Sequence, residues 1–252
     1  MKKVLLALVT VIFFATSFYR IESDKKAEPK TQKIKTPLTL IKKADPAKNT
    51  TAEVYSSISF ENINILNPEV FNKAYLGFTN LKKAGKLPAN ANIISIADFS
   101  LSSTKKRLWV IDLEKKKVLF NSLVAHGKNT GEEYAKNFSN TESSYQSSLG
   151  FYVTETTYNG SNGYSLKLLG MDPGYNDAAL QRAIVMHGAD YVSEDFIKSQ
   201  KRIGRSWGYP AVPRALAAPI INTIKGQNLL FIYYPDQQYL SKSEWLRDGA
   251  AV

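Results

Sequence analysis

The sequence contains no cysteine among its 252 residues, and this absence excludes two kinds of chemistry. The chain can form no disulfide, and it has no thiol to act as a nucleophile or a metal ligand. Hydrophobic residues make up 44% of the sequence and aromatic residues 12%. That composition suits a globular domain with a core large enough not to need disulfides, and it excludes a mainly disordered chain.

Long apolar runs are also missing, apart from one near the N-terminus. Residues 4–15 are almost wholly apolar, follow Lys2 and Lys3, and lead into the small residues Ala15-Thr16-Ser17. The run is short for a membrane span, and its flanks are typical of an export signal. We therefore expect residues 1–20 to be a signal peptide or, if uncleaved, an anchor that tethers the chain to the membrane. Either outcome predicts a periplasmic or cell-envelope protein.

The charge is unbalanced, with a formal net charge of +11. Residues 21–54 are rich in Lys, Thr, Pro and Ala and poor in aromatics, which indicates a flexible linker. A basic exported domain suits a polyanionic surface such as the cell wall, although a solvated surface explains the charge equally well. Nucleic acid is not an expected partner, because the export signal directs the chain away from it.

Periodicity predicts a helix and then a series of strands. Asn67 and Pro68 open a helix that Gly85 can end. Short β-branched or alternating runs then predict strands, and Ser193 and Pro213 open two further helices. Because strands outnumber helices without regular alternation, we expect a mixed α+β, β-dominated fold and not a doubly wound sheet. The strands are expected at 92–99, 107–113, 117–125, 149–158, 164–170, 182–188 and 228–235.

Histidine is scarce, and both histidines, His126 and His187, precede a glycine at the end of a predicted strand. Strand ends are where side chains reach a cleft, and glycine allows a ligand to approach closely. A buried, hydrogen-bonded side chain is the ordinary alternative for each. His187 is the stronger candidate, because the unusual loop "GRSWGYPAVP" at residues 204–213 follows it.

Four segments carry a resemblance to a known family. They read "KKRLWVIDLEKKKVLFNSLVAHGKNTG", "FSNTESSYQSSLGFYVT", "RAIVMHGADYVS" and "GRSWGYPAVP". Together they resemble the L,D-transpeptidase (YkuD-type) family, in its murein L,D-transpeptidase catalytic domain branch. The resemblance implies a β-sandwich or barrel with a few packed helices. It divides the remaining chain into an N-terminal helical segment (55–91), a catalytic domain (92–240) and a C-terminal tail (241–252).

The resemblance also implies a chemistry. Such enzymes cut the bond before the terminal D-residue of a peptidoglycan stem peptide through a cysteine thioester, and pass the acyl group to an amine or to water. No cofactor or metal is implied. The catalytic positions then fall on His187, Ser206, Gly208 and Tyr209, and the substrate-contacting positions on His126, Gly188, Arg205 and Trp207. Arg202 and Arg205 are expected to make this neighbourhood basic.

The departure from the family pattern lies at the nucleophile. The family reads Ser-x-Gly-Cys, and this chain reads Ser206-Trp207-Gly208-Tyr209. A phenol ionises near pH 10 in model peptides, against about 8.5 for a thiol. Three interpretations remain open: a non-catalytic peptidoglycan-binding relative, an enzyme with Tyr209 or Ser206 as its nucleophile, or a single-base change from a cysteine codon. A zinc peptidase using His126, His187 and Asp190 is a fourth hypothesis from another class. The oligomeric state is not predicted.

Overall fold

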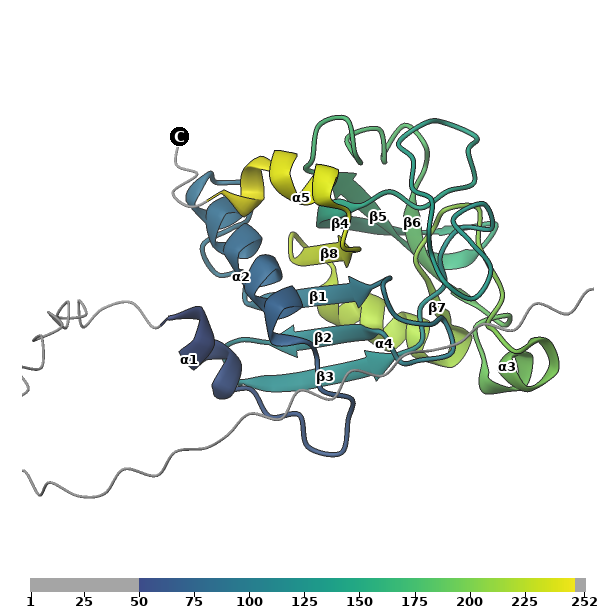
Figure 1. Cartoon of the computed structure of the whole chain (residues 1–252), viewed down its shortest axis with the longest axis horizontal. Helices are drawn as coiled ribbons and strands as arrows, with labels where there is room; N and C mark the ends of the chain where they lie inside the picture. Colours follow the sequence, from purple (N-terminus) through teal and green to yellow (C-terminus); the bar gives the residue numbers. More distant parts are fainter. Residues whose placement is uncertain (1–49, 248–252) are drawn as a thin grey trace, which may run out of the picture. The chain divides into compact units, whose positions relative to one another are not determined.

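Eight strands form one strongly curved sheet in a computed structural model that describes residues 50–247. The strand order is β3-β2-β1-β8-β4-β5-β6-β7 (Figure 1). Two neighbouring pairs, β1 with β8 and β6 with β7, are parallel, and the other pairs are antiparallel. The bounds are β1 Ile93–Asp98, β2 Leu108–Asp112, β3 Lys117–Ser122, β4 Gly150–Gly160, β5 Gly163–Gly170, β6 Val185–Ala189, β7 Ala211–Pro213 and β8 Leu229–Tyr233.

The two ends of this sheet come close to each other. The chain that leaves β3 reaches the opposite end of the strand order, where Ala125 N–H donates to the Ala211 carbonyl at 2.8 Å. A second bridge joins Gly127 to Ser206. The sheet is therefore a nearly closed barrel, and the predicted β-dominated α+β fold class is confirmed. Seven strands lie where the sequence predicts them, whereas β7 was not predicted.

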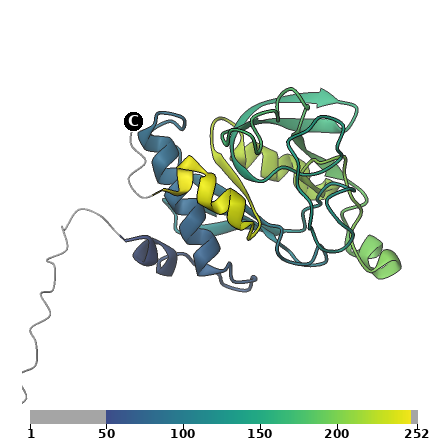
Figure 2. The ribbon, with the colours of Figure 1, turned by 45° about the horizontal axis from the view of Figure 1, so that its top comes forward.

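Two helices cover the sheet. The long helix α2 (Pro68–Lys83) begins as predicted, with the Asn67 side chain accepting from Glu69 N–H at 2.8 Å. It buries its apolar face against β1 and β8, beside the C-terminal helix α5 (Gln237–Lys242), as Figure 2 shows. Helix α4 (Arg214–Ile224) packs mainly on β6. The short helix α3 (Glu194–Gln200) is capped by Ser193 as predicted.

The start of the described chain corrects part of the linker prediction. Helix α1 (Thr51–Ser56) begins inside the predicted linker 21–54. A capping box joins Thr50 and Glu53, and Tyr55 packs its ring 5.3 Å from that of Phe71 on α2. These local and tertiary contacts order a segment whose composition alone indicates a linker. The predicted signal peptide and the rest of the linker lie outside the described residues.

The end of the chain corrects the tail prediction. Residues 241–247 pack as the end of α5 and a 3₁₀ turn, Glu244–Leu246, with Trp245 buried. Asn80 of α2 donates its amide to the Trp245 carbonyl at 3.0 Å and the Arg247 carbonyl at 3.1 Å. Burial of one large aromatic ring, with its backbone satisfied, holds this segment on α2. Residues 248–252 lie outside the described part. Within residues 50–247, no helix combines the length and apolar composition needed to cross a bilayer.

A buried carboxylate joins this C-terminal segment to the sheet. Asp172 accepts hydrogen bonds from the Phe151 N–H of β4 (2.7 Å), from the Tyr239 hydroxyl (3.3 Å) and from the Ser243 hydroxyl. Burial is the largest influence on this carboxyl and raises its pKa from 3.8 to about 6, against the opposing effect of these donors. Asp172 therefore binds a proton more tightly in the folded state than in the unfolded state.

This difference predicts a pH dependence of stability. The free energy of unfolding should fall as the pH rises from 3.8 to about 6, by up to about 3 kcal/mol for this one group. The Asp172→Asn variant should lack that component. Urea unfolding of both proteins at pH 4, 5, 6 and 7 measures it as the difference between the two curves. Parallel curves would show that the Asp172 pKa is not raised.

Candidate active site

His187 lies on β6, between Ser165 of β5 and Ala211 of β7 in the sheet register. Its side chain is buried, and Nδ1 lies 3.1 Å from the Gly188 carbonyl oxygen. Because a carbonyl only accepts, Nδ1 carries the proton, and Nε2 is left as an acceptor. Burial lowers the pKa of His187; the Gly188 carbonyl opposes this shift, and Arg214 adds to it. A neutral imidazole with a free Nε2 is the form that can accept a proton.

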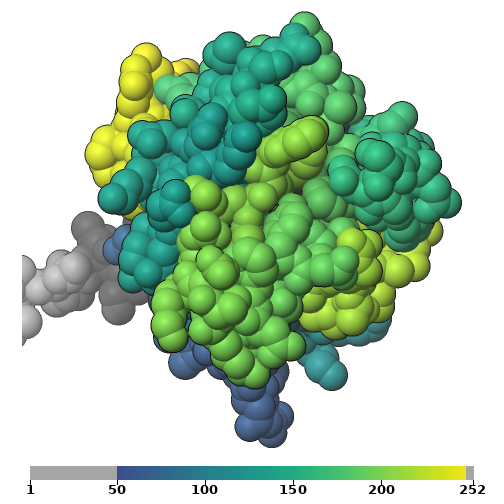
Figure 3. Space-filling model, turned by 90° about the vertical axis from the view of Figure 1, so that its right-hand side faces the viewer, coloured from purple at the N-terminus to yellow at the C-terminus, as the bar shows by residue number. Residues whose placement is uncertain are grey.

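Tyr209 presents its ring to His187. The two ring centroids are 5.8 Å apart and the rings are nearly perpendicular, at 76°. Both side chains line one cavity of about 310 Å³, together with Ser161, Asn162, Tyr191, Arg205, Ser206 and Trp207. The sequence-based prediction that His187 and Tyr209 share a cleft is therefore confirmed. Figure 3 shows this side of the domain, where the yellow-green segment around residues 195–210 lies between teal loops and the green β4–β5 hairpin.

The loop that carries Tyr209 is held by two serine hydroxyls. Ser206 Oγ donates to the Tyr209 carbonyl at 2.6 Å and accepts from Gly208 N–H at 3.1 Å. Ser147 Oγ donates to the Gly208 carbonyl at 3.2 Å and accepts from Gly127 N–H at 3.0 Å. The buried Ser206 hydroxyl proton is thus directed at a backbone carbonyl and not at His187. This geometry argues against Ser206 as the nucleophile.

Two glycines in this region are required by packing. Gly208 has φ +111°, and a Cβ there would lie 2.6 Å from the Gln146 carbonyl oxygen. At Gly188, a Cβ would lie 2.8 Å from the Ala217 Cβ of α4. Gly188 was predicted to contact substrate. The structure shows another reason for a glycine there, because α4 packs so closely against β6 that a Cβ would not fit.

The expected basic neighbourhood of the loop needs a correction. Arg205 lies 2.6 Å from a Glu132 carboxylate oxygen, and Arg202 lies 3.0 Å from the other. Glu132 therefore offsets the positive charges of Arg202 and Arg205. Sequence reasoning missed this pairing because Glu132 lies about seventy residues before the two arginines. Arg205 lines the cavity even so.

The cation that sequence reasoning missed is Arg182. It is almost fully buried and donates to the carbonyls of Ser139 and Gln146, each at 2.8 Å, and to two serine hydroxyls. Burial lowers the pKa of this guanidinium, while Tyr152 and Tyr209 raise it. Arg182 therefore holds the loop around Gln146, next to the Gly208 turn.

Trp207 stands at the mouth of the cavity. Its side chain is 63% exposed, and its ring centroid is 5.7 Å from that of Tyr145. Lys128 Nζ lies 4.2 Å above the Tyr145 ring. A large apolar ring left exposed beside a cavity is a feature of binding surfaces, and the substrate contact of Trp207 stays a prediction.

His126 is not part of this cavity. Its ring is buried, with Nδ1 2.7 Å from Arg107 Nη2 and Nε2 3.2 Å from the Gly131 carbonyl. Since Arg107 only donates, Nδ1 accepts and Nε2 carries the proton. Burial and then the Arg107 charge lower the pKa of His126 to about 3. The predicted substrate contact of His126 therefore lacks an exposed surface, and the residue serves as a buried hydrogen-bonded link.

The zinc hypothesis lacks a ligand set in the described part of the chain. Asp190 is exposed and forms an ion pair with Arg214 at 2.6 Å, and His126 Nδ1 accepts a hydrogen bond from Arg107. Residues 50–247 contain no group of three or more His, Cys, Asp or Glu side chains that could hold a metal ion.

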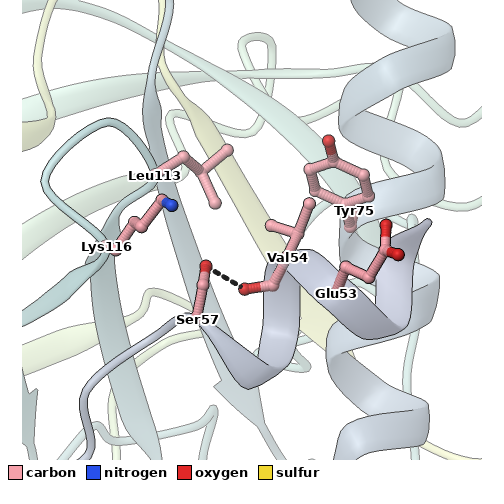
Figure 4. A pocket seen from close by; sticks show the side chains of 6 residues that line it. All are labelled: Glu53, Val54, Ser57, Tyr75, Leu113 and Lys116. Carbon is pink, nitrogen blue, oxygen red and sulfur yellow. Dashed lines mark hydrogen bonds between the residues drawn. The ribbon is translucent and has the colours of Figure 1, made fainter. Parts of the chain in front are cut away.

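Another cavity lies between α1, α2 and the β2–β3 turn. It has a volume of about 350 Å³ and is lined by Glu53, Val54, Ser57, Tyr75, Leu113 and Lys116 (Figure 4). None of the predicted site residues lines it. The cavity around His187 and Tyr209 is lined by five of the eight predicted site residues, and it is therefore the candidate active site.

Comparison with known proteins identifies the family of this chain. The sequence profile of the L,D-transpeptidase catalytic domain family matches residues 62–233, which include every predicted site residue. The chain therefore belongs to the L,D-transpeptidase catalytic domain family. A search of curated proteins returned no match.

Solved structures of similar proteins include several L,D-transpeptidases. The L,D-transpeptidase from Mycobacterium smegmatis is 12% identical (TM-score 0.36), over 57% of this chain and 59% of that one. L,D-transpeptidase 1 from Mycobacterium tuberculosis is 12% identical (TM-score 0.33; 56% and 62%). The helical cell shape determining protein Pgp2 from Campylobacter jejuni is 13% identical (TM-score 0.39; 66% and 57%). The chain spans about 60% of their lengths, and at these scores they add no weight to the family match.

The two histidines predict a distinctive NMR signature. His187 should be a neutral Nδ1–H tautomer and His126 a neutral Nε2–H tautomer, because their hydrogen-bond partners are opposite in kind. On acidification, His187 should ionise below pH 6.5 and His126 only near pH 3. Long-range ¹H–¹⁵N spectra measure both, and the His187→Gln variant assigns the signals. Two identical tautomers, or a His187 pKa above 6.5, would contradict the geometry.

Proposed function

We propose that this domain binds peptidoglycan stem peptides in the cavity around His187 and Tyr209, on the wall-facing side of the cell envelope. The observation that carries the proposal is the fixed pair of rings: a neutral His187 with a free Nε2, beside the residue in the nucleophile position of the family motif. Membership in the L,D-transpeptidase catalytic domain family supplies the substrate class. The predicted export signal at residues 1–20 and the part of the predicted linker that precedes α1 would bring the domain to the wall.

The loop retains parts that acyl transfer requires. Within residues 50–247, the N–H groups of Trp207 and Tyr209 donate to no backbone acceptor of the loops, and we propose that they bind a substrate carbonyl oxygen. Backbone N–H groups next to a nucleophile stabilise the oxyanion that forms there. The Ser206 and Ser147 hydrogen bonds keep the loop in one conformation.

The nucleophile itself is what the chain lacks. At neutral pH a phenol is far less ionised than a thiol, and its oxygen lies several bonds further from the backbone. The ring of Tyr209 also lines the cavity where a scissile carbonyl would approach a shorter side chain. We therefore propose a binding protein without cysteine-type transpeptidation. Catalysis through the Tyr209 hydroxyl is the second candidate, because Tyr209 lines the cavity beside His187, whose Nε2 can accept a proton.

The first test restores a short nucleophile. The Tyr209→Cys variant should form a covalent acyl adduct with a tetrapeptide stem, as the thiolate attacks the carbonyl before the terminal D-residue and the amine of that residue leaves. Intact mass spectrometry detects the adduct. Because the chain has no other cysteine, the modified thiol is unambiguous. The double variant Tyr209→Cys/His187→Ala should react about a hundredfold more slowly, since the base is lost.

Wild-type protein is the matched control. It should bind the tetrapeptide, seen as protection of the exposed Trp207 from acrylamide quenching, with neither adduct nor turnover. Turnover by wild type that is lost in Tyr209→Phe would instead establish tyrosine catalysis. Failure of wild type to bind and of Tyr209→Cys to react, both in folded protein, would reject the proposed function.

A further inference from the structure

The loop before β7, which holds the nucleophile position of the family motif, is bonded at both ends to one short segment, residues 124–131. Ser206 N–H donates to the His126 carbonyl at 3.0 Å, and the Ser206 carbonyl accepts from Lys128 N–H at 2.8 Å. At the far end of the loop, the Ala211 carbonyl accepts from the N–H of the residue before His126 at 2.8 Å. The position of residues 124–131 therefore sets the position of the loop.

Arg107 holds this segment through a fully buried guanidinium. Nε and Nη2 donate to the Val124 carbonyl at 3.2 and 3.1 Å, and Nη2 also donates to His126 Nδ1 at 2.7 Å. On its other side, Nη1 donates to the Leu101 carbonyl at 2.7 Å, and the guanidinium lies 4.7 Å from the Phe99 ring centroid. Because Val124 lies outside the eight strands, its carbonyl has no partner in a strand ladder, and Arg107 supplies one.

The charge of Arg107 is buried without a carboxylate partner, because Arg107 forms no ion pair within residues 50–247. Burial lowers its pKa to about 9, while the charge of Asp98 opposes this shift, so the guanidinium stays protonated at neutral pH. A buried charge is costly unless hydrogen bonds satisfy it. Movement of residues 124–131 away from Arg107 would leave its donors unpaired, and the charge therefore resists displacement of the segment.

His126 carries this constraint to the cavity in two ways. Its backbone carbonyl accepts from Ser206 N–H, and its Nε2–H donates to the Gly131 carbonyl at 3.2 Å. The same Gly131 carbonyl accepts from Arg205 Nη1 at 3.2 Å, and Arg205 lines the cavity around His187. A displacement of His126 would therefore move both the loop and a side chain of the cavity wall.

We propose that Arg107 and His126 are positioning residues, which hold the loop before β7 in place so that Tyr209 faces His187. Neither side chain lines the cavity, so neither is a catalytic residue. The inference rests on the proposed function, because this loop is the part of the cavity that would bind the carbonyl of the stem peptide. The arginine acts through the histidine, and the hydrogen bond between them is the contact to test.

Two substitutions of nearly equal size separate that hydrogen bond from the packing around it. His126→Asn keeps an acceptor near the place of Nδ1, whereas His126→Leu removes it and leaves one N–H of Arg107 buried and unpaired. Arg107→Lys is a second variant, because it keeps the charge and loses the planar set of donors. Val70→Ala is the control for a general loss of stability, because Val70 is buried on α2 and lies outside the cavity lining.

Two measurements on the full chain separate positioning from stability. The first is the nuclear Overhauser effect between the ring protons of His187 and Tyr209, which reports the separation of the two rings in the folded protein. The second is the dissociation constant of the tetrapeptide stem, obtained from acrylamide quenching of Trp207. Urea unfolding gives the stability of each variant.

His126→Leu should lose most of the nuclear Overhauser effect and bind the tetrapeptide about tenfold more weakly than wild type. Arg107→Lys should change both quantities in the same direction. His126→Asn should keep both near their wild-type values, because the acceptor is retained. Val70→Ala should lower the free energy of unfolding and leave both unchanged.

A His126→Leu protein that is less stable but keeps the wild-type nuclear Overhauser effect would overturn the positioning role. Failure of both His126→Leu and Arg107→Lys to fold would also overturn it, because the pair would then serve the fold as a whole. If wild type does not bind the tetrapeptide, the proposed function fails, and the nuclear Overhauser effect still decides the role of Arg107 and His126.

Discussion

The pairing of β6 with β7 is the constraint on which the site depends. His187 is in register with Ala211 in this parallel pair, and Tyr209 lies two residues before Ala211. The register therefore brings the backbones of His187 and Tyr209 close together, and the Ser206 and Ser147 hydrogen bonds hold the loop that carries Tyr209. Gly188 lets α4 pack closely behind β6, and Gly208 lets the loop turn beneath Gln146. A bulkier residue at either position would displace one of the two strands.

The elements of the fold were predictable where a local pattern specifies them. Alternating apolar residues located seven strands, and Asn67 with Pro68 located the start of α2. The strand β7 was missed because it is three residues long and lies among prolines. The C-terminal helices were missed because Trp245, Asn80 and Asp172 are brought together only by tertiary packing. The order of residues 51–56 likewise depends on the contact between Tyr55 and Phe71.

The features of the site were also predictable only in part. The motif brought His187, Ser206, Gly208 and Tyr209 into one prediction, and the structure brings all four together. The sequence did not reveal that Glu132 forms ion pairs with Arg202 and Arg205. It also did not reveal that Arg107 donates a hydrogen bond to His126. It also gave no sign of Arg182, whose partners lie 34 to 43 residues away. Ion pairs between residues distant in the sequence decide which positive charges near the site are neutralised. The residue types alone do not predict these pairs.

The central claim is that His187 and the loop remain arranged to activate a short nucleophile at position 209. The pH profile of iodoacetamide alkylation of the Tyr209→Cys variant tests this most directly, because it reports the pKa of the only thiol in the chain. Because His187 Nε2 can take the proton of a thiol at position 209 and form a thiolate–imidazolium pair, the account predicts that this pKa lies below the ordinary value of about 8.5. It also predicts a rise toward that value when His187→Ala is added. Identical profiles with and without His187 would contradict the account.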